Sequence, residues 1–317
     1  MLQVKVIERS DEAQGVVCFA LARSNGEDLP MFRAGAHIDV HLGDGLSRQY
    51  SLCGHPDQLR SYRIGVLKET ESRGGSRAMH ERVQVGDLLM VSEPKNHFPL
   101  AANAERSLLF AGGIGITPVL CMAEELTRDG QPFALHYCGR SRARMAFLDR
   151  IASSAFATQA QVHCDDGPPG QRLDAARAIG SPSSGAHLYV CGPTGFMEHV
   201  LGTARSLGWA EDRLHREYFA ATPVDHSADG SFEIELKLSG RVIVVSADRS
   251  AAEALAEAGV DVPLSCEQGV CGTCITKVLA GAPDHRDMYF TDDERRRNDC
   301  FTPCCSRSLT PRLVLDL

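Results

Sequence analysis

The clearest chemical signal in the chain is a group of cysteines near its C-terminus. Six of the 12 cysteines lie at or after residue 266, and three of them form the pattern Cys266-x4-Cys271-x2-Cys274. Thiolates at this spacing hold a plant-type [2Fe–2S] cluster, which needs a fourth cysteine further along the chain. Gly269 and Gly272 let the backbone wrap closely and turn N–H groups toward the sulfurs. The pattern therefore predicts one-electron chemistry at an iron–sulfur site.

Three cysteines are candidates for the fourth ligand: Cys300, Cys304 and Cys305. Cys304 follows Cys274 after 29 intervening residues, which is the separation in chloroplast-type ferredoxins, and the loop resembles theirs. We therefore expect Cys304 to be the ligand. A structural zinc site and inert thiols are the alternatives. Zinc usually takes paired C-x2-C units, and only one such pair is present.

Two glycine-containing turns follow strand-like segments in the middle of the chain. The first is Ala111–Pro118 (AGGIGITP) and the second is Tyr189–Gly195 (YVCGPTG). Glycine lets the backbone approach a phosphate at the N-terminus of the following helix. Two such turns at strand ends of one parallel sheet can line a single crevice. They predict a dinucleotide site, and the alternative is a pair of ordinary strand-to-helix turns.

The succession G-G-I-G-I-T-P and C-G-P resembles the nicotinamide-binding signature of the ferredoxin reductase superfamily. The resemblance implies that Cys191 and Thr117 set the nicotinamide against a flavin. It further implies an NADH site made by Gly112, Gly113, Gly115, Arg140, Cys191, Gly192 and Pro193. Arg140 and Arg142 either hold a phosphate or are simply solvated, which leaves NADPH open beside the favoured NADH.

A flavin motif precedes these turns. Arg48-Gln49-Tyr50-Ser51 fits the R-x-Y-S pattern of the same superfamily, and an arginine can fork onto a phosphate. The resemblance implies that Ser51 lies near the flavin atom that receives hydride. It also implies an FMN site made by Arg48, Gln49, Tyr50, Ser51, Val66, Leu67, Lys68, Gly74, Gly75, Ser76, Thr117 and Phe219. A chance strand motif and, for Phe219, a core phenylalanine are the alternatives.

The elements around these motifs divide the chain into three domains. Residues 1–101 show short strands broken by turns, which predict an antiparallel β-barrel. Residues 102–221 alternate strand and helix patterns, with helices expected at 118–127, 143–152, 173–179 and 196–207, and predict a parallel α/β sheet. Residues 222–230 are small and polar, as in a linker. Residues 231–317 predict an α+β β-grasp ferredoxin domain.

The order of the three domains resembles the phthalate dioxygenase reductase family over essentially the full length. Asp284-His285-Arg286-Asp287 and Pro303-Cys304-Cys305-Ser306-Arg307 strengthen the resemblance. It implies FMN rather than FAD, electron flow from NADH through FMN to the cluster, a separate Rieske-type oxygenase as acceptor, and a monomer. The flavin stands between because NADH delivers two electrons and the cluster accepts one. A cytochrome P450 as acceptor, and a redox-sensing role without turnover, are the alternatives.

Composition excludes several other classes of protein. The 317 residues are 43% hydrophobic and 23% charged, which is ordinary for a globular chain and unlike a disordered one. A net charge of −8 argues against nucleic acid as a partner. No run of 18 apolar residues predicts a membrane span, and the N-terminus lacks the pattern of a secretory signal. We therefore expect a cytoplasmic protein.

Overall fold

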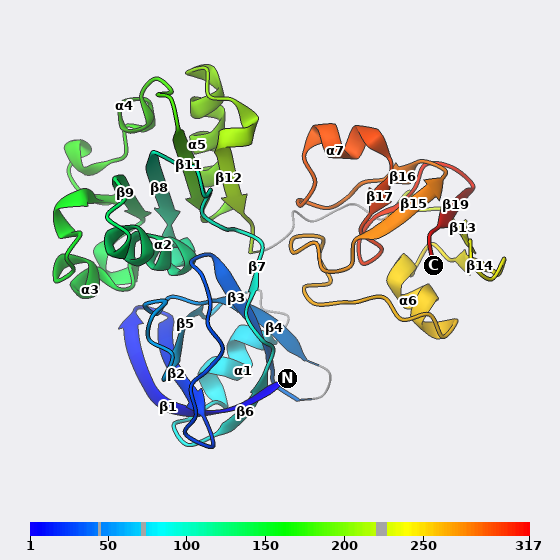
Figure 1. Ribbon diagram of the computed structural model, residues 1–317, viewed down its shortest axis with the longest axis horizontal. Coiled ribbons are helices and arrows are strands. Elements are labelled where there is room, and N and C mark those ends of the chain that lie inside the picture. Colours follow the sequence, from blue (N-terminus) through cyan, green and yellow to red (C-terminus); the bar gives the residue numbers. More distant parts are fainter. Residues whose placement is uncertain (44–45, 71–73, 220–226) are drawn as a thin grey trace. The chain divides into compact units, whose positions relative to one another are not determined.

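The computed structural model describes residues 1–43, 46–70, 74–219 and 227–317. They form two compact units, Met1–Glu217 and Tyr218–Leu317 (Figure 1). The first unit holds an antiparallel and a parallel sheet, and the second holds a mixed sheet. The predicted fold class is therefore confirmed. Of the predicted linker 222–230, residues 222–226 lie outside the described part.

The antiparallel sheet closes into a barrel. Its strand order is β4-β3-β6-β1-β2-β5, with β7 beside β3, and a bridge between Leu52 and Ile64 joins the two ends. The helix α1 follows β5. The elements are β1 (Leu2–Ala13), β2 (Val16–Arg23), β3 (Ala36–His41), β4 (Ser47–Ser51), β5 (Tyr62–Leu67), α1 (Gly75–Glu81), β6 (Leu88–Val91) and β7 (Lys95–Asn96).

Strands β1 and β2 differ in how visible they are in the sequence. In β1, Leu2, Val4 and Val6 are buried while their neighbours are exposed, which gives the period of two expected of a half-buried strand. The first six residues of β2 are all buried. A strand with both faces covered shows no alternation, so the period of two does not reveal β2 in the sequence.

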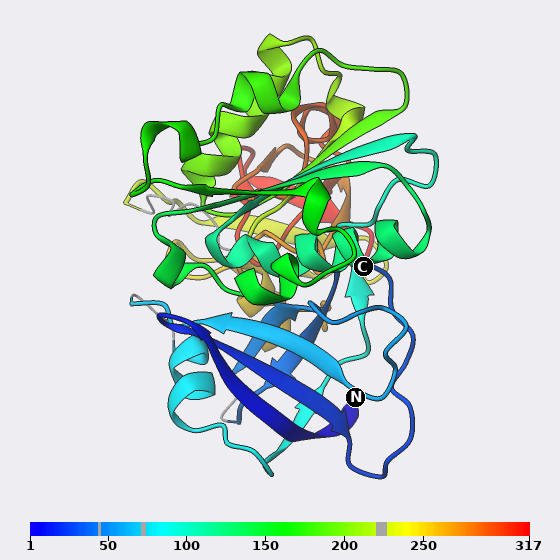
Figure 2. The same cartoon turned by 90° about the vertical axis from the view of Figure 1, so that its left-hand side faces the viewer.

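The parallel sheet carries the predicted nucleotide turns. Its order is β10-β9-β8-β11-β12, and Figure 2 shows it edge-on above the barrel of the same unit. The chain order reverses between β8 and β11, where α/β sheets bind ligands at the strand ends. The elements are β8 (Arg106–Gly112), α2 (Ile116–Arg128), β9 (Phe133–Gly139), α3 (Leu148–Ala152), β10 (Ala160–Cys164), α4 (Ala175–Ile179), β11 (Ala186–Cys191), α5 (Thr194–Ser206) and β12 (Leu214–Glu217).

The helix predicted over 143–152 is wrong in its first half. Only Leu148–Ala152 is α-helical, after a single 3₁₀ turn at Arg142–Arg144. Phe147 takes a left-handed backbone with φ 62° and is buried. Its ring lies where a side chain on Gly65 of the barrel would stand, with Cζ 3.2 Å from the Cβ position. Burial of this ring against the barrel overrides the local helical pattern.

Two histidine pairs join neighbouring strands of the parallel sheet. His136 Nδ1 on β9 lies 3.1 Å from His163 Nε2 on β10, and His187 Nδ1 on β11 lies 2.8 Å from His215 Nε2 on β12. Burial, reinforced by the partner ring, lowers the pKa of His136 and of His215 to about 4. Burial also lowers the pKa of His163 and of His187. The folded domain therefore favours neutral rings.

We expect this domain to lose stability in mild acid. Unfolded histidine titrates near pH 6.5, so the stabilisation is present above about pH 6.5 and is lost as the pH falls toward about 4. Between pH 7 and pH 5 the thermal midpoint of His136→Gln/His163→Gln should fall less than that of the unmodified protein. His199→Gln, on the exposed face of α5, is the control. Equal slopes for all three proteins would contradict the prediction.

The second unit has the β-grasp arrangement. Strands run in the order β14-β13-β19-β15-β17, with β13 parallel to β19, and β16 pairs with β18 separately. A reciprocal capping box between Ser250 and Glu253 starts α6. The elements are β13 (Phe232–Leu236), β14 (Val242–Val245), α6 (Ala251–Glu257), β15 (Thr276–Ala280), β16 (Pro283–Asp284), α7 (Asp292–Arg297), β17 (Cys300–Phe301), β18 (Arg307–Ser308) and β19 (Arg312–Leu315).

Candidate functional site

The structure brings the four predicted cluster cysteines together. Cys274 Sγ lies 3.3 Å from Cys304 Sγ, and Cys266 contacts both Cys271 and Cys304. Three of these sulfurs come from the loop before β15 and the fourth from the loop before β18. The sulfur of Cys305 also contacts that of Cys304 and lies 3.3 Å from Thr302 Oγ1.

The loop around these sulfurs fits a [2Fe–2S] cluster. Gly269 and Gly272 have φ of 73° and 71°, a conformation that glycine adopts at little cost. The N–H of Gln268 donates to Cys266 Sγ at 3.4 Å, and that of Thr273 to Cys271 Sγ at 3.5 Å. N–H groups aimed at ligand sulfurs favour the reduced cluster. Four thiolates with this backbone match the chemistry that the sequence predicts.

The barrel presents groups that fit an anionic, partly buried ligand. Arg48 on β4 packs on Gly75, where an added Cβ would lie 2.8 Å from the guanidinium Nε. The turn formed by Gly74, Gly75 and Ser76 therefore lies against a positive charge. Tyr50 Oη is buried and has no hydrogen-bond partner among the described residues, and burial raises its pKa. A buried hydroxyl in this condition fits a polar ligand.

The other predicted flavin residues occupy different surroundings. Val66 on β5 has its side chain in the barrel core, and its carbonyl accepts a hydrogen bond from His80 Nε2 at 2.9 Å. Lys68 pairs with Glu81 at 3.0 Å, and Leu67 is half-buried. Gln49 Nε2 lies 3.1 Å from His37 Nε2. Phe219 belongs to the second unit and is 44% exposed, and its assignment to the FMN site stays a prediction.

The two glycine turns meet backbone to backbone at the β8–β11 switch point. A Cβ on Gly115 would lie 2.7 Å from the nitrogen of Gly192, and one on Gly192 would lie 2.9 Å from Gly112 Cα. Gly113 takes φ 54°. The structure therefore places both turns side by side, with Arg140 and Pro193 exposed at the same edge of the sheet. The N-terminus of α2 lies at these turns and favours an anion.

Thr117 and Cys191 lie buried beside these two turns. Thr117 Oγ1 donates to the carbonyl of Ile114 at 3.0 Å, and its methyl group reaches the barrel, 2.8 Å from a Cβ placed on Gly65. Burial, reinforced by the nearby Glu217, raises the pKa of Cys191 well above its usual range. Cys191 is therefore a neutral thiol at neutral pH and contributes shape rather than a nucleophile.

Glu217 links the two motifs and was not predicted as a site residue. Its Oε2 accepts a hydrogen bond from Ser51 Oγ at 3.4 Å, and it stands opposite Cys191 in the β11–β12 register. Burial raises the pKa of Glu217 to about 8, although the Ser51 hydrogen bond opposes the shift. The available signal was an acidic residue at the end of a strand beside the Cys191 turn.

We expect Glu217→Gln to stabilise the protein in alkaline solution. The native carboxyl has a raised pKa, so the folded state holds its proton more tightly than the unfolded state does. Stability therefore falls as the pH rises from about 4.5 to about 8. The amide cannot ionise, so its thermal midpoint should exceed the native one by a margin that grows over this interval. A margin independent of pH would contradict the assignment.

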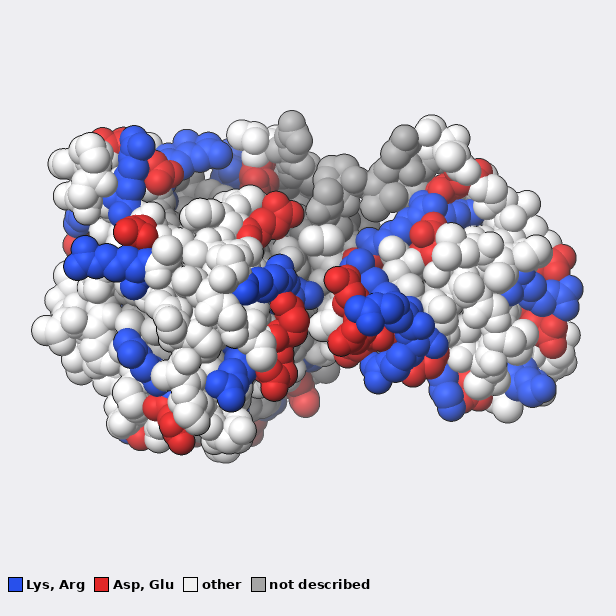
Figure 3. Space-filling model, turned by 90° about the horizontal axis from the view of Figure 1, so that it is seen from above, with Lys and Arg blue, Asp and Glu red and all other residues white. Residues whose placement is uncertain are grey.

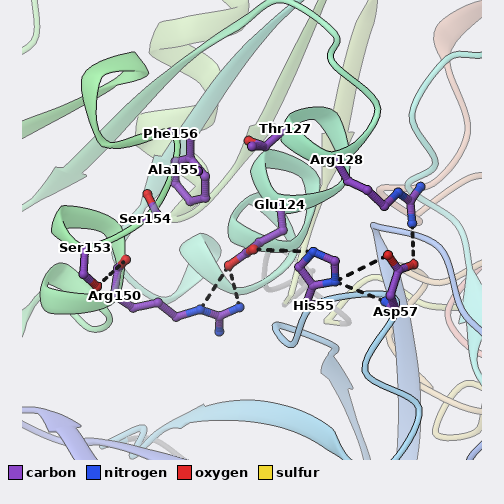
Figure 4. A pocket seen from close by; sticks show the side chains of 10 residues that line it. All are labelled: His55, Asp57, Glu124, Thr127, Arg128, Arg150, Ser153, Ser154, Ala155 and Phe156. Carbon is purple, nitrogen blue, oxygen red and sulfur yellow. Dashed lines mark hydrogen bonds and ion pairs between the residues drawn. The ribbon is translucent and has the colours of Figure 1, made fainter.

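A cavity of about 540 Å³ lies away from these strand ends (Figure 4). Its charges pair with one another: Arg150 Nη2 lies 2.8 Å from Glu124, and Arg128 Nη1 lies 2.8 Å from Asp57. Arg150 also donates to the carbonyl of Cys53 at 2.7 Å. These bonds tie a barrel loop to α2 and α3. The residues that line this cavity therefore connect the barrel to the helices of the parallel-sheet domain, which is a structural role.

Comparisons with known proteins agree with this geometry. A family model described as a 2Fe-2S iron-sulfur cluster binding domain matches residues 234–309, and one described as an oxidoreductase NAD-binding domain matches residues 109–201. The chain is 54% identical over 318 residues to vanillate O-demethylase oxidoreductase of Pseudomonas putida, covering 100% of both chains.

Two of the solved structures that cover the whole of this chain differ in the share of their own length that is matched. One is phthalate dioxygenase reductase, with a TM-score of 0.76, 36% identity and 98% of that chain covered. The other is an intact type IV self-sufficient cytochrome P450 monooxygenase, with a TM-score of 0.87, 39% identity and 41% of that chain covered.

Proposed function

The chain belongs to the reductase family that includes phthalate dioxygenase reductase, and on that premise we propose that it serves a Rieske-type oxygenase that demethylates a methoxylated aromatic acid such as vanillate. It is an NADH-dependent oxidoreductase that passes electrons through FMN and a [2Fe–2S] cluster to a separate oxygenase component. The observation that supports the proposed substrate class is the 54% identity over the full length to a vanillate O-demethylase oxidoreductase.

The barrel binds the flavin that accepts the hydride, and the two glycine turns bind the nicotinamide that donates it. A bound FMN accepts two electrons from NADH together and releases them singly. We assign its phosphate to Arg48 and the Gly74–Ser76 turn, and its ring to Tyr50 and Ser51, with Val66, Leu67, Lys68 and Phe219 as further contacts. The Ser51–Glu217 hydrogen bond fixes the serine hydroxyl. A protonated Glu217 keeps negative charge away from the acceptor of a hydride.

The two glycine turns bind the other reactant, NADH. The N–H groups at the start of α2 and the close approach of Gly115 to Gly192 suit the dinucleotide phosphates. Thr117 and Cys191 limit how deeply the nicotinamide ring can enter, which orients it. We assign the remaining contacts to Gly112, Gly113, Arg140 and Pro193, and the cluster to Cys266, Cys271, Cys274 and Cys304.

We further propose a monomer in the cytoplasm, with FMN-binding, NAD-binding, linker and ferredoxin segments at 1–101, 102–221, 222–230 and 231–317. The longest described helices, α2 and α5, have 13 residues, and none in the described part is long and apolar enough to cross a bilayer.

The face in Figure 3 mixes positive and negative side chains. It differs from the uniformly basic surface that binds nucleic acid.

A cytochrome P450 is the second candidate acceptor. The structural match to a self-sufficient P450 monooxygenase supports it, since the whole of this chain aligns with 41% of that protein. The higher identity to the demethylase oxidoreductase favours the first candidate.

The first experiment is an anaerobic absorbance titration of the purified protein with NADH. One equivalent should bleach both flavin bands and a broad cluster shoulder. Purified Rieske oxygenase and P450 components are then supplied separately with vanillate or other aromatic substrates. NADH-dependent formaldehyde release only with the Rieske component supports the proposal, and turnover only with the P450 overturns it.

A further inference from the structure

A carboxylate from the segment before the ferredoxin fold is buried between two arginines. The side chain of Asp229 is 2% exposed, and those of Arg286 and Arg307 are 15% and 7% exposed. Arg286 donates from Nη2 to Asp229 Oδ1 at 2.6 Å and from Nη1 to Oδ2 at 2.9 Å. Arg307 Nε lies 3.6 Å from Asp229 Oδ2. A carboxylate so deeply buried is tolerated only when it is paired in this way.

Each arginine also holds other parts of the second unit. Arg307 donates to the carbonyls of Gly230, Ser246 and Arg249 at 2.7–3.0 Å, and its guanidinium lies 5.3 Å from the centre of the Phe232 ring. Arg286 also bonds to Asp284, 2.7 Å from Oδ2. Through its two arginines, Asp229 therefore connects several segments that are far apart in the sequence.

Both arginines meet the C-terminal end of the loop that carries Cys304. Arg307 follows Cys304 by three positions, begins β18 and stands opposite Asp284 of β16. The N–H of Arg286 donates to Ser306 Oγ at 3.2 Å, and Ser306 Oγ lies 2.8 Å from Thr302 Oγ1. Asp229 thus reaches Ser306, at the end of the loop 302–306, through Arg286 and through the neighbouring Arg307, and Ser306 passes the connection on to Thr302.

The buried side chain of Asp287 also contacts the loop 302–306. It is 1% exposed, and its Oδ2 accepts the N–H groups of Tyr289 at 3.1 Å and Phe290 at 2.8 Å. Its Oδ1 lies 3.5 Å from the hydroxyls of Thr302 and Ser306. The Asp284–Asp287 stretch therefore has two tasks: Arg286 binds the incoming segment, and Asp287 binds the cysteine loop.

We propose that Asp229 is a positioning residue for the iron–sulfur cluster, holding the Cys304 loop closed through Arg286 and Arg307. The proposal rests on the assignment of Cys304 as a cluster ligand under the proposed function. It makes the end of the linker part of the cluster site, because the ferredoxin fold proper begins only at Phe232. Without the carboxylate, buried Arg307 loses its ion pair and Arg286 keeps only Asp284, so the loop opens more often.

The test uses the full-length holoprotein with Asp229→Asn, which is isosteric and uncharged. The rate of cluster loss in a chelator, followed by the visible absorbance of the cluster, should rise about tenfold. The electron paramagnetic resonance spectrum of the NADH-reduced cluster should broaden. The single-turnover rate of flavin reduction by NADH should stay within about twofold, since that chemistry lies in the first unit.

Two further variants make the comparison decisive. Glu233→Gln removes an exposed carboxylate that lies 2.6 Å from Arg312 in the same unit, and it should leave cluster loss unchanged. Asp229→Glu keeps the charge and should restore most of the lifetime, even if Asp229→Asn is recovered without a cluster. Native rates of cluster loss in Asp229→Asn, or equal acceleration in Glu233→Gln, would overturn the proposal. Absence of a cluster from the unmodified protein would instead overturn the proposed function.

Discussion

Replacing Cys304 with serine is expected to reduce NADH-dependent reduction of cytochrome c by at least about 100-fold. Cytochrome c takes electrons one at a time from the cluster, and a lost thiolate ligand removes or loosens that cluster. Ferricyanide can take electrons directly from the flavin. Its reduction should therefore stay within about twofold of the native rate, because the Cys304 loop belongs to the second unit and the flavin motif to the first.

Cys305→Ser and Cys300→Ser are the matched controls for this prediction. The sulfur of Cys305 contacts both Cys304 and Thr302, and Cys300 stands opposite Lys277 in the β15–β17 pair. Both variants should keep the visible cluster absorbance and most cytochrome c activity. Loss of the cluster in Cys305→Ser and its survival in Cys304→Ser would reassign the fourth ligand to Cys305.

Replacing Gly115 with alanine is expected to slow flavin reduction by NADH by about 100-fold. The backbone at Gly115 is ordinary, with φ −59°, so the effect is purely steric. The added Cβ would strike the carbonyl of Cys191 and lie 2.7 Å from the nitrogen of Gly192. These are backbone atoms, which cannot move aside as a flexible side chain can. The two turns must separate, and the nicotinamide loses its alignment.

Gly195→Ala supplies the control for Gly115→Ala. Gly195 is the last residue of the second glycine segment and lies in the first turn of α5, where an added Cβ meets no heavy atom within 4 Å. Stopped-flow absorbance with NADH should show a native rate for Gly195→Ala and a slow rate for Gly115→Ala. Cluster absorbance should be unchanged in both. A native rate in Gly115→Ala would show that the two turns do not need their close contact.

Linear motifs account for most of what the sequence could predict. The cysteine spacing, the two glycine turns and the R-x-Y-S segment each place their groups within a few consecutive residues, so local geometry follows from order alone. The period of two in β1 and the alternation of strands and helices after residue 105 likewise reflect local burial. For this reason the fold class and the cofactor set could be predicted without coordinates.

Contacts between distant segments could not be predicted in this way. Ser51 and Glu217 are separated by 166 positions but share a hydrogen bond, and Asp229 meets Arg286 and Arg307 only through the β-grasp fold. Phe147 interrupts a helical pattern because its ring is buried at the barrel. In each case the energy comes from removing a group from water beside a particular partner, and sequence spacing does not reveal that partner.

The sequence alone thus determined which ligands this protein takes and in which order along the chain they bind. Thiolates, glycine turns and an arginine at these spacings bind few ligands other than an iron–sulfur cluster, a dinucleotide and a flavin phosphate. Only the tertiary structure decided which acids lie among them, namely half-buried Glu217 beside Ser51 and Cys191 and buried Asp229 between Arg286 and Arg307. The reason is that the cost of burying a charge depends on its three-dimensional surroundings.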